Sequence, residues 1–337
     1  MAHANRDLPL VPSFSVKLNG RPLLPEMSMW IVNVVVEDEL DLPGMFTLEL
    51  ISKETELGTT AWTDEPRLAL GATVEVSMGY GDDRESLMVG EIVALEPTFS
   101  IAGPPSLLVR GFDLRHRLNG TRRTRSFVDK TDSSIAEQIG SDAGVDIQAT
   151  DSSVTHPYVM QADQTDLEFL RERAHRMQYE LAMDGRTMLF RPVANASSSE
   201  VTLTLSDDLF EFRPRMSLVP VTGVQVLGWD PKEKQTLRAA APSTDAGDRV
   251  ETLVRSPIAS QAEADQVAVA AFNSAALEFI RGDGRVRGRT DVRAGRVVHL
   301  DELGTRFSGT YYLTSVVHRY SPRDGYLTEF RAQRTES

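Results

Sequence analysis

The chain has 337 residues, 41% hydrophobic and 25% charged, which is enough for two or three domains with cores of their own. It contains no cysteine, which excludes disulfides, thiolate nucleophiles and cysteine metal sites. Its net charge of −13 argues against general affinity for nucleic acid, because such binding depends on lysine and arginine neutralising phosphates. Residues 1–10 lack the apolar core of a signal peptide, and no stretch approaches a membrane span, so we expect folding in the cytoplasm.

The first third of the chain predicts β structure. Apolar residues alternate along 14–18 and lead into Asn19 and Gly20, a dipeptide typical of tight hairpins. A nearly unbroken apolar run at 30–36 and an alternating one at 46–50 predict further strands.

The middle of the chain predicts helices. Thr131 or Asp132 can cap a short helix that ends near Gly144. Thr165 and Glu168 form the pattern of a capping box, in which each side chain bonds the other residue's free backbone N–H. We therefore expect a second helix to begin there.

Strands are expected again after the second helix. Residues 181–192 predict a hairpin, and 201–205 and 221–228 predict single strands. A polar loop is expected over 230–249.

A second capping box predicts the longest helix. Ser260 and Glu263 open it, and the glycine-rich stretch 282–284 is expected to end it as a turn. The tripeptide Arg281-Gly282-Asp283 is interpreted as part of that turn.

Two distant stretches carry the same β pattern, which predicts an internal duplication. In each copy a glycine leads into alternating apolar positions, and a strand of the form apolar-x-Gly-x-apolar follows. The expected equivalent positions are Gly71 with Gly295, Gly90 with Gly309, Met88 with Phe307, and Ile92 with Tyr311.

These patterns predict a mainly β fold with α+β parts. We expect two similar antiparallel β-barrel domains, a small α/β domain and a helical insertion. The expected boundaries are 1–113 for the first barrel, 114–197 for the α/β domain, and 198–337 for the second barrel with its insertion near 260–281.

No catalytic, cofactor-binding or metal-binding residue is predicted. None of the six histidines lies in a close ligand pair, and nucleophile motifs and phosphate loops are missing from the sequence. We therefore predict no cofactor. The candidate protein-interface residues are a dense basic run, whose alternative role is ion pairing within its domain: Arg115, Arg117, Arg122, Arg123 and Arg125.

Several loose motifs lie in the middle and at the end of the chain. They are Gly111-Phe112-Asp113-Leu114, Arg117-Leu118, Arg125-Ser126-Phe127, Thr131 with Ile135, Gln161, Asp166-Leu167-Glu168-Phe169-Leu170 and Ala174, and Gly309-Thr310-Tyr311-Tyr312-Leu313 with Val316, His318, Gly325-Tyr326 and Thr328. Together they resemble the late control protein D family of contractile phage tails. That family includes baseplate hubs of phages and tailocins, and it resembles the N-terminal half of type VI secretion spike proteins.

The resemblance implies a structural baseplate hub without catalytic activity, in a phage tail or another contractile injection system. As a homotrimer, it would act as a symmetry adaptor between a hexameric inner tube protein and a separate central spike protein, beside other baseplate proteins. No specific nucleic acid and no membrane insertion are expected. The protein would be cytoplasmic during assembly and then part of the particle. Relatives often have a glycine where this chain has Met177-Gln178-Tyr179, so that turn is expected to differ.

Two alternatives of other classes stay open. Abundant carboxylates would suit a tail-tip enzyme that degrades cell walls, since glycoside hydrolysis needs only two well-placed acids. A β-rich carbohydrate-binding module would use Trp30, Trp62 and Trp229.

Overall fold

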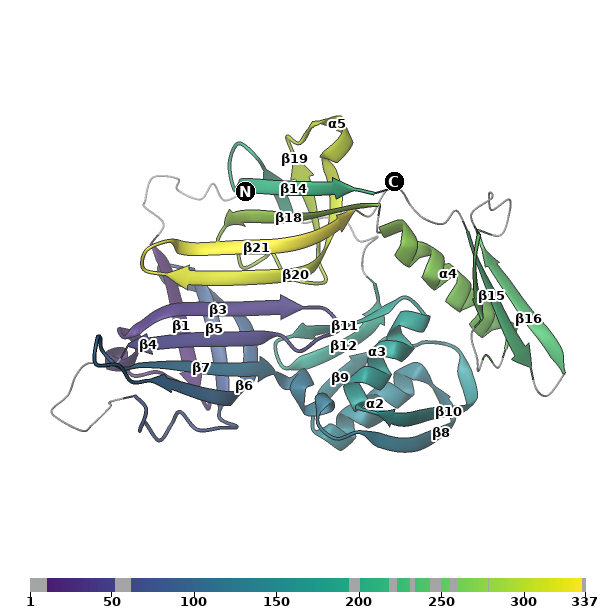
Figure 1. Cartoon of the computed structure of the whole chain (residues 1–337), viewed down its shortest axis with the longest axis horizontal. Helices are drawn as coiled ribbons and strands as arrows, with labels where there is room; N and C mark the ends of the chain where they lie inside the picture. Colours follow the sequence, from purple (N-terminus) through teal and green to yellow (C-terminus); the bar gives the residue numbers. More distant parts are fainter. Residues whose placement is uncertain are drawn as a thin grey trace.

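The protein is mainly β with α+β parts, as predicted from the sequence (Figure 1). The computed structural model describes residues 11–51, 62–193, 201–217, 223–230, 234–242, 250–254, 258, 260–277 and 279–334. Four separate clusters of buried apolar side chains lie within these residues. The predicted domain boundaries, after residues 113 and 197, stay a prediction.

One 13-stranded sheet runs through both ends of the chain, in the order β14-β18-β21-β20-β3-β4-β7-β6-β5-β1-β2, with β19 and β13 branching from β20. Its first half contains α1 (Pro25–Ser28) and the strands β1 (Pro12–Leu18), β2 (Arg21–Pro22), β3 (Ile31–Glu39), β4 (Met45–Ile51), β5 (Thr73–Tyr80), β6 (Asp83–Thr98) and β7 (Ser106–Asp113). Its second half contains α5 (Gly304–Phe307) and the strands β13 (Val201–Thr204), β14 (Leu209–Met216), β18 (Ile280–Arg287), β19 (Val297–Asp301), β20 (Gly309–Ser321) and β21 (Gly325–Arg334).

The two halves share one strand topology. Six strands of the first half correspond to six of the second, both in chain order and in pairing order. The matches are β1 with β13, β3 with β14, β4 with β18, β5 with β19, β6 with β20 and β7 with β21. Four of the five ladders are antiparallel in both halves, and the remaining ladder differs, since β1 runs antiparallel to β5 whereas β13 runs parallel to β19. Each half curves around its own core (Figure 1).

β-bulges mark the same places in both halves. The β6–β7 ladder shifts between Ile92 and Ala94, and the β20–β21 ladder shifts between Leu313 and Ser315. A second matching pair of shifts occurs in β3 and β14, between Ile31 and Asn33 and between Leu209 and Glu211. Because bulges are specific local features rather than a general property of β sequences, their agreement supports a common plan for the two halves.

Strand β20 joins the halves. Its first part pairs with β19, and its second part, residues 315–320, pairs antiparallel with residues 34–39 of β3. Tyr326 of β21 also enters the first core, where it stands 5.8 Å from the Tyr80 ring. The two halves are therefore parts of one sheet and share core residues.

The α/β domain lies between the halves in sequence, and its hydrophobic helix faces pack on its own strands. Thr131 accepts a hydrogen bond from the Ser134 N–H at the start of α2, and Gly144 ends that helix with a positive φ. The reciprocal capping box of Thr165 and Glu168 is present at the start of α3. The elements of the α/β domain are η1 (Leu114–Asn119), β8 (Arg123–Thr131), α2 (Asp132–Ala143), β9 (Asp146–Ala149), β10 (Thr155–Gln164), α3 (Asp166–Arg176), β11 (Tyr179–Asp184) and β12 (Thr187–Pro192).

The insertion in the second half is larger than the predicted helix. A helix packs on a three-stranded sheet, and a strand lies inside the stretch expected to be a polar loop. Its elements are β15 (Gly223–Asp230), β16 (Gln235–Ala241), β17 (Val250–Val254) and α4 (Gln261–Leu277). The insertion falls between β14 and β18, where the first half has only the short connection from β3 to β4.

The expected glycine turn after the long helix is wrong. Gly282 and Gly284 lie inside strand β18, opposite Pro214 and Phe212. A Cβ on Gly284 would lie 2.2 Å from the Phe330 ring, and one on Gly282 would lie 2.5 Å from the Phe212 ring. These glycines therefore make room for core rings from neighbouring strands instead of bending the chain.

Candidate assembly surfaces

Gly71 and Gly295 occupy the same place in the two halves. Gly71 donates its N–H to the Ile92 carbonyl, and Gly295 donates its N–H to the Leu313 carbonyl. Their φ angles are +82° and +76°, a region that strongly favours glycine. Each glycine thus fixes the entry to a corresponding strand.

The expected match of Gly90 with Gly309 is wrong by two residues. Val74 faces Gly90 in the first half, and Val298 faces Tyr311 in the second. Gly90 therefore corresponds to Tyr311. Gly309 pairs with Leu300 and corresponds to Met88, which pairs with Val76. A shift of two keeps every side chain on its face of the sheet, so alternating patterns alone do not reveal it.

Arg115 is buried rather than exposed at a surface. Its side chain is 0% exposed, and its Nη2 lies 2.7 Å from the Asp113 Oδ2, while its Nη1 donates to the Leu181 carbonyl at 2.9 Å. Asp113 also accepts a hydrogen bond from the Gly44 N–H. The expectation that Arg115 contacts a partner is therefore wrong, and this residue instead ties the first half to the α/β domain.

Arg117 also links these two parts of the chain. Its guanidinium pairs with the Glu91 carboxylate of β6 and donates to the Gly144 carbonyl at 2.7 Å. The bond from Arg117 lowers the pKa of the Glu91 carboxyl.

The remaining arginines of the run pair with acids of the α/β domain, while the side chains of Arg122 and Arg123 stay 51% and 43% exposed. The alternative of ion pairing within the domain therefore describes their contacts. The pairs are Arg122 with Asp163 and Glu168, Arg123 with Asp166, and Arg125 with Asp142 and Asp166.

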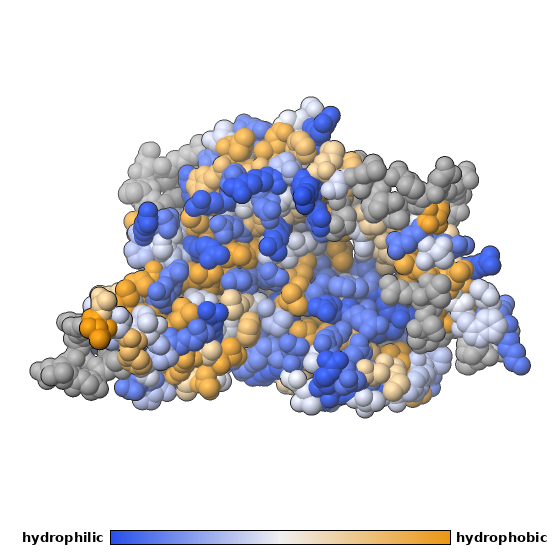
Figure 2. Space-filling model, viewed as in Figure 1, coloured by the Kyte–Doolittle hydropathy of each residue, from blue (hydrophilic) through white to orange (hydrophobic). Residues whose placement is uncertain are grey.

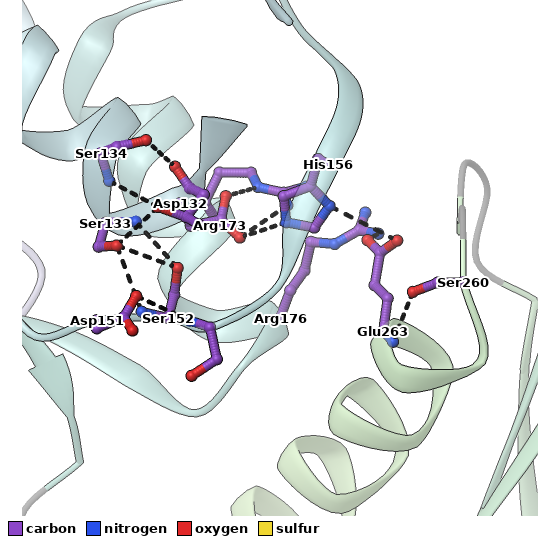
Figure 3. A network of polar contacts seen from close by, with 12 residues as sticks. Asp132, Ser133, Ser134, Asp151, Ser152, His156, Arg173, Arg176, Ser260 and Glu263 are labelled. Atoms are coloured by element: carbon purple, nitrogen blue, oxygen red, sulfur yellow. Dashed lines mark hydrogen bonds and ion pairs between the residues drawn. The ribbon is translucent and has the colours of Figure 1, made fainter. Parts of the chain in front are cut away.

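A buried polar network joins the α/β domain to the insertion (Figure 3). At its centre the Asp132 carboxylate accepts from Arg173 Nη2 at 2.9 Å and lies 2.9 Å from His156 Nε2. Burial by itself would raise the pKa of Asp132, but the bonds from His156 and Arg173 outweigh it, so the pKa is lowered. Residue patterns gave no sign of this network, because its members come from α2, β10 and α3.

Glu263 extends the network into α4. Its N–H donates to the Ser260 hydroxyl oxygen at 3.2 Å, so Ser260 caps the helix, and its carboxylate lies 2.7 Å from Arg176 Nη2 and 3.9 Å from His156 Nδ1. The predicted capping role of Ser260 is therefore present, and the Glu263 side chain reaches across to the α/β domain (Figure 3).

Glu180 of β11 provides another buried link to the second half. It accepts a hydrogen bond from the Tyr312 hydroxyl and pairs with Arg191 at 2.9 Å, and Arg191 in turn donates to the Gly295 carbonyl at 3.0 Å. Burial raises the pKa of the Glu180 carboxyl. These contacts hold the α/β domain against the second half of the sheet.

The outer face of the sheet is charged around the joint between the halves. A depression of about 490 Å³ there contains carboxylates of Glu37, Glu39 and Glu329 beside guanidinium groups of Arg319 and Arg331. Figure 2 shows hydrophilic residues gathered over β18, β21 and β20 on this side. Both signs of charge are mixed, so this face has no large field of a single sign.

Two strand edges have no partner in the described ladders of the sheet and carry exposed apolar side chains, one along the second part of β6 and one along β14. Val93 and Phe99, at and just beyond the second part of β6, are 38% and 64% exposed. Phe210 and Met216 of β14 are 51% and 42% exposed. In the described ladders, residues 94–98 pair only with β7 and β14 pairs only with β18. Open edges of this kind can pair with a strand of another chain.

The described part of the chain has no group of three or more acidic or histidine side chains arranged to hold a metal ion. None of its helices has the length and apolar character needed to cross a membrane. His318 is fully buried, with its Nδ1 2.9 Å from the Tyr326 hydroxyl, as a structural histidine would be. Of the three tryptophans, Trp229 is exposed, whereas Trp62 packs against the first core.

Residues 9–322 match the Alg8 N-terminal domain family, and the chain belongs to that family. A comparison with curated protein sequences finds no match.

Solved structures with this fold are tail proteins and a secretion component. The 43 kDa tail protein of prophage MuSo2 from Shewanella oneidensis is 17% identical, with a TM-score of 0.75 over 96% of this chain and 98% of that one. A tail protein from Neisseria meningitidis MC58 is 15% identical, with a TM-score of 0.73 over 96% and 97%. A type VI secretion system component of E. coli, described as similar to bacteriophage T4 tail proteins, is 14% identical, with a TM-score of 0.66 over 94% and 76%. The fold is therefore that of these tail and secretion-system proteins.

Proposed function

We propose that the protein is a structural hub at the end of a contractile tail or injection particle. In this proposal it is a homotrimer that adapts a hexameric inner tube protein to a separate central spike protein, with other baseplate proteins around it. It assembles in the cytoplasm and then remains part of the particle. The tail proteins that share its fold support this class of function.

The repeated topology carries the proposal. Each chain contains two halves in which six matched strands have the same order. Three chains thus offer six similar units, which is what a tube with six equal contacts requires. Head-to-tail contacts between such units close into a ring when the rotation between neighbours divides a full turn.

The mass of the purified full chain in solution tests the trimer. Sedimentation velocity should give a species with three times the chain mass of 37.3 kDa. The trimer should also bind the inner tube protein of the same particle, in a pull-down with the isolated spike protein as the second bait. A protein that stays monomeric over the full concentration range, and that binds neither bait, would refute the hub.

The hub has no catalytic role in this proposal. Abundant carboxylates alone support the alternative of a cell-wall-degrading enzyme. Incubation with purified peptidoglycan should release no more soluble fragments than buffer does. Release that one Asp or Glu substitution abolishes would replace the structural role with the enzymatic one.

The exposed arginines of the run form part of the assembly surface in this proposal. Arg122 and Arg123 keep about half of their side-chain surface open beside their acidic partners. The double substitution Arg122→Glu and Arg123→Glu should weaken binding to other baseplate proteins, because it places negative charge against an acidic partner surface. Arg323→Glu, at an exposed position in the turn between β20 and β21, is the control. Intact assembly together with the loss of a measurable DNA affinity would contradict the interface role.

A further inference from the structure

The strand pair that joins the two halves has an equivalent pair of strands, and these two strands do not pair with each other within the chain. Residues 315–320 of β20 pair with residues 34–39 of β3 inside the chain. The topological match assigns β6 as the counterpart of β20 and β14 as the counterpart of β3. In the described ladders, the corresponding edges of β6 and β14 have no partner strand, and they lie far apart in the strand order.

We propose that these edges form the contact between copies, with β6 of one chain facing β14 of the next in the arrangement that β20 and β3 adopt within the chain. The inference rests on the proposed trimer and names the residues that would build it. The two edges are of different types, so the contact is head-to-tail, which is the kind that generates rings.

The shared bulges fix the register of this contact. Counting from them, Ala94 corresponds to Ser315 and Glu211 corresponds to Asn33. Transferring the pairing of β20 with β3 places Glu96 opposite Arg215 and Leu95 opposite Met216.

The side chains on the two edges are complementary in this register. Glu96, 50% exposed beside Arg110, meets the exposed Arg215. The exposed Phe99 and Met216 add apolar surface at the two edges. Pairing of β14 with another β14 around Pro214 would instead set Arg213 against Arg215, and like charges directly opposite destabilise a strand pair. The side chains therefore favour β6 with β14 over β14 with itself.

Prolines occupy corresponding positions on both edges. Leu40 donates its N–H to the Thr314 carbonyl across the internal joint, and alternation from there makes His318 and Val36 a hydrogen-bonded pair. Their counterparts are Pro97 and Pro214, which have no N–H to donate. The contact between copies thus lacks two backbone hydrogen bonds that the internal joint has, and it depends more on side chains.

The same prolines protect the isolated chain. Proline on an edge strand blocks pairing with an arbitrary strand at that position. Each edge is therefore poorly suited to general strand addition and selects its partner through Glu96 and Arg215. This combination suits a subunit that must stay separate until it meets another copy.

Charge reversal tests the contact in the full chain. Glu96→Arg and Arg215→Glu should each raise the concentration at which half of the chains are trimeric by about tenfold or more, and the double variant should restore it. Glu137→Arg and Arg323→Glu make the same charge changes at exposed positions away from both edges, and they should leave it unchanged. The measurement is sedimentation velocity over a dilution series.

A cysteine pair gives a second readout, because the chain has no cysteine of its own. Positions 96 and 215 form a non-hydrogen-bonded pair in the proposed register, where Cα atoms lie about 4.5 Å apart, within the reach of a disulfide. The double variant Glu96→Cys with Arg215→Cys should oxidise to covalent dimers and trimers, whereas Glu96→Cys with Arg323→Cys should not. A wild-type monomer would overturn the proposed function. A wild-type trimer that resists both reversals and does not cross-link would overturn this contact alone.

Discussion

Arg115 shows how one buried side chain holds two parts of the molecule together. Its charge is compensated by Asp113, and both side chains are almost completely buried. Arg115→Ala should lower the free energy of unfolding by about 3–5 kcal/mol, because it leaves the Asp113 carboxylate buried without its partner. Urea unfolding checks this, with Arg122→Ala as the exposed control, for which we expect less than about 1 kcal/mol. Equal losses in both variants would show that the burial of Arg115 is unimportant.

The lowered pKa of Asp132 predicts how the free energy of unfolding depends on pH. Its pKa is lowered from the usual 3.8, so the folded state binds its proton less readily than the unfolded state does. The stabilisation is present above pH 3.8 and is lost as pH falls through the lowered folded-state pKa. Asp132→Asn should therefore flatten the fall in unfolding free energy below about pH 4. Urea midpoints measured between pH 7 and pH 3 check this, and identical slopes in both proteins would contradict it.

At the scale of elements, strand β18 depends on glycines that leave space for rings. Gly284→Ala would force the Phe330 ring to move from contact at 2.2 Å and should destabilise the protein by about 1–3 kcal/mol. Gly103→Ala is the matched control, because a Cβ there meets no atom within 4 Å and the backbone is not in the left-handed region. Thermal unfolding of the two variants compares them. A stable Gly284→Ala protein would mean that the ring has room to shift.

Local signals predicted the helix starts well, whereas contacts between distant segments could not be predicted. Thr131 and Thr165 cap their helices as expected, because a cap involves residues three positions apart. The sequence predicts a turn at Gly282 and Gly284, but both lie within β18, and the rings that need their space come from other strands. The partners of Arg115 and Asp132 likewise lie on separate elements. The predicted repeat is offset by two residues, because a shift of two leaves the alternating pattern unchanged.

At the scale of the whole molecule, the acidic charge opposes assembly. Each chain carries a net charge of −13, so copies repel one another at long range. Raising the salt concentration from about 0.02 M to about 0.2 M should increase the trimeric fraction at fixed protein concentration, because the Debye length falls below about 10 Å. Sedimentation velocity measures the fraction. Dissociation at high salt would instead show that ion pairs between copies outweigh the repulsion.

The shared sheet also constrains the order in which the protein can fold. The first core contains Tyr326, and the edge of β3 is covered by residues 315–320, both from strands that are synthesised long after the first half. The first half therefore has a hole in its core and an open edge until β20 and β21 have been synthesised. During that interval it must remain soluble as an unfinished domain, and the final hairpin β20–β21 closes both halves in one step.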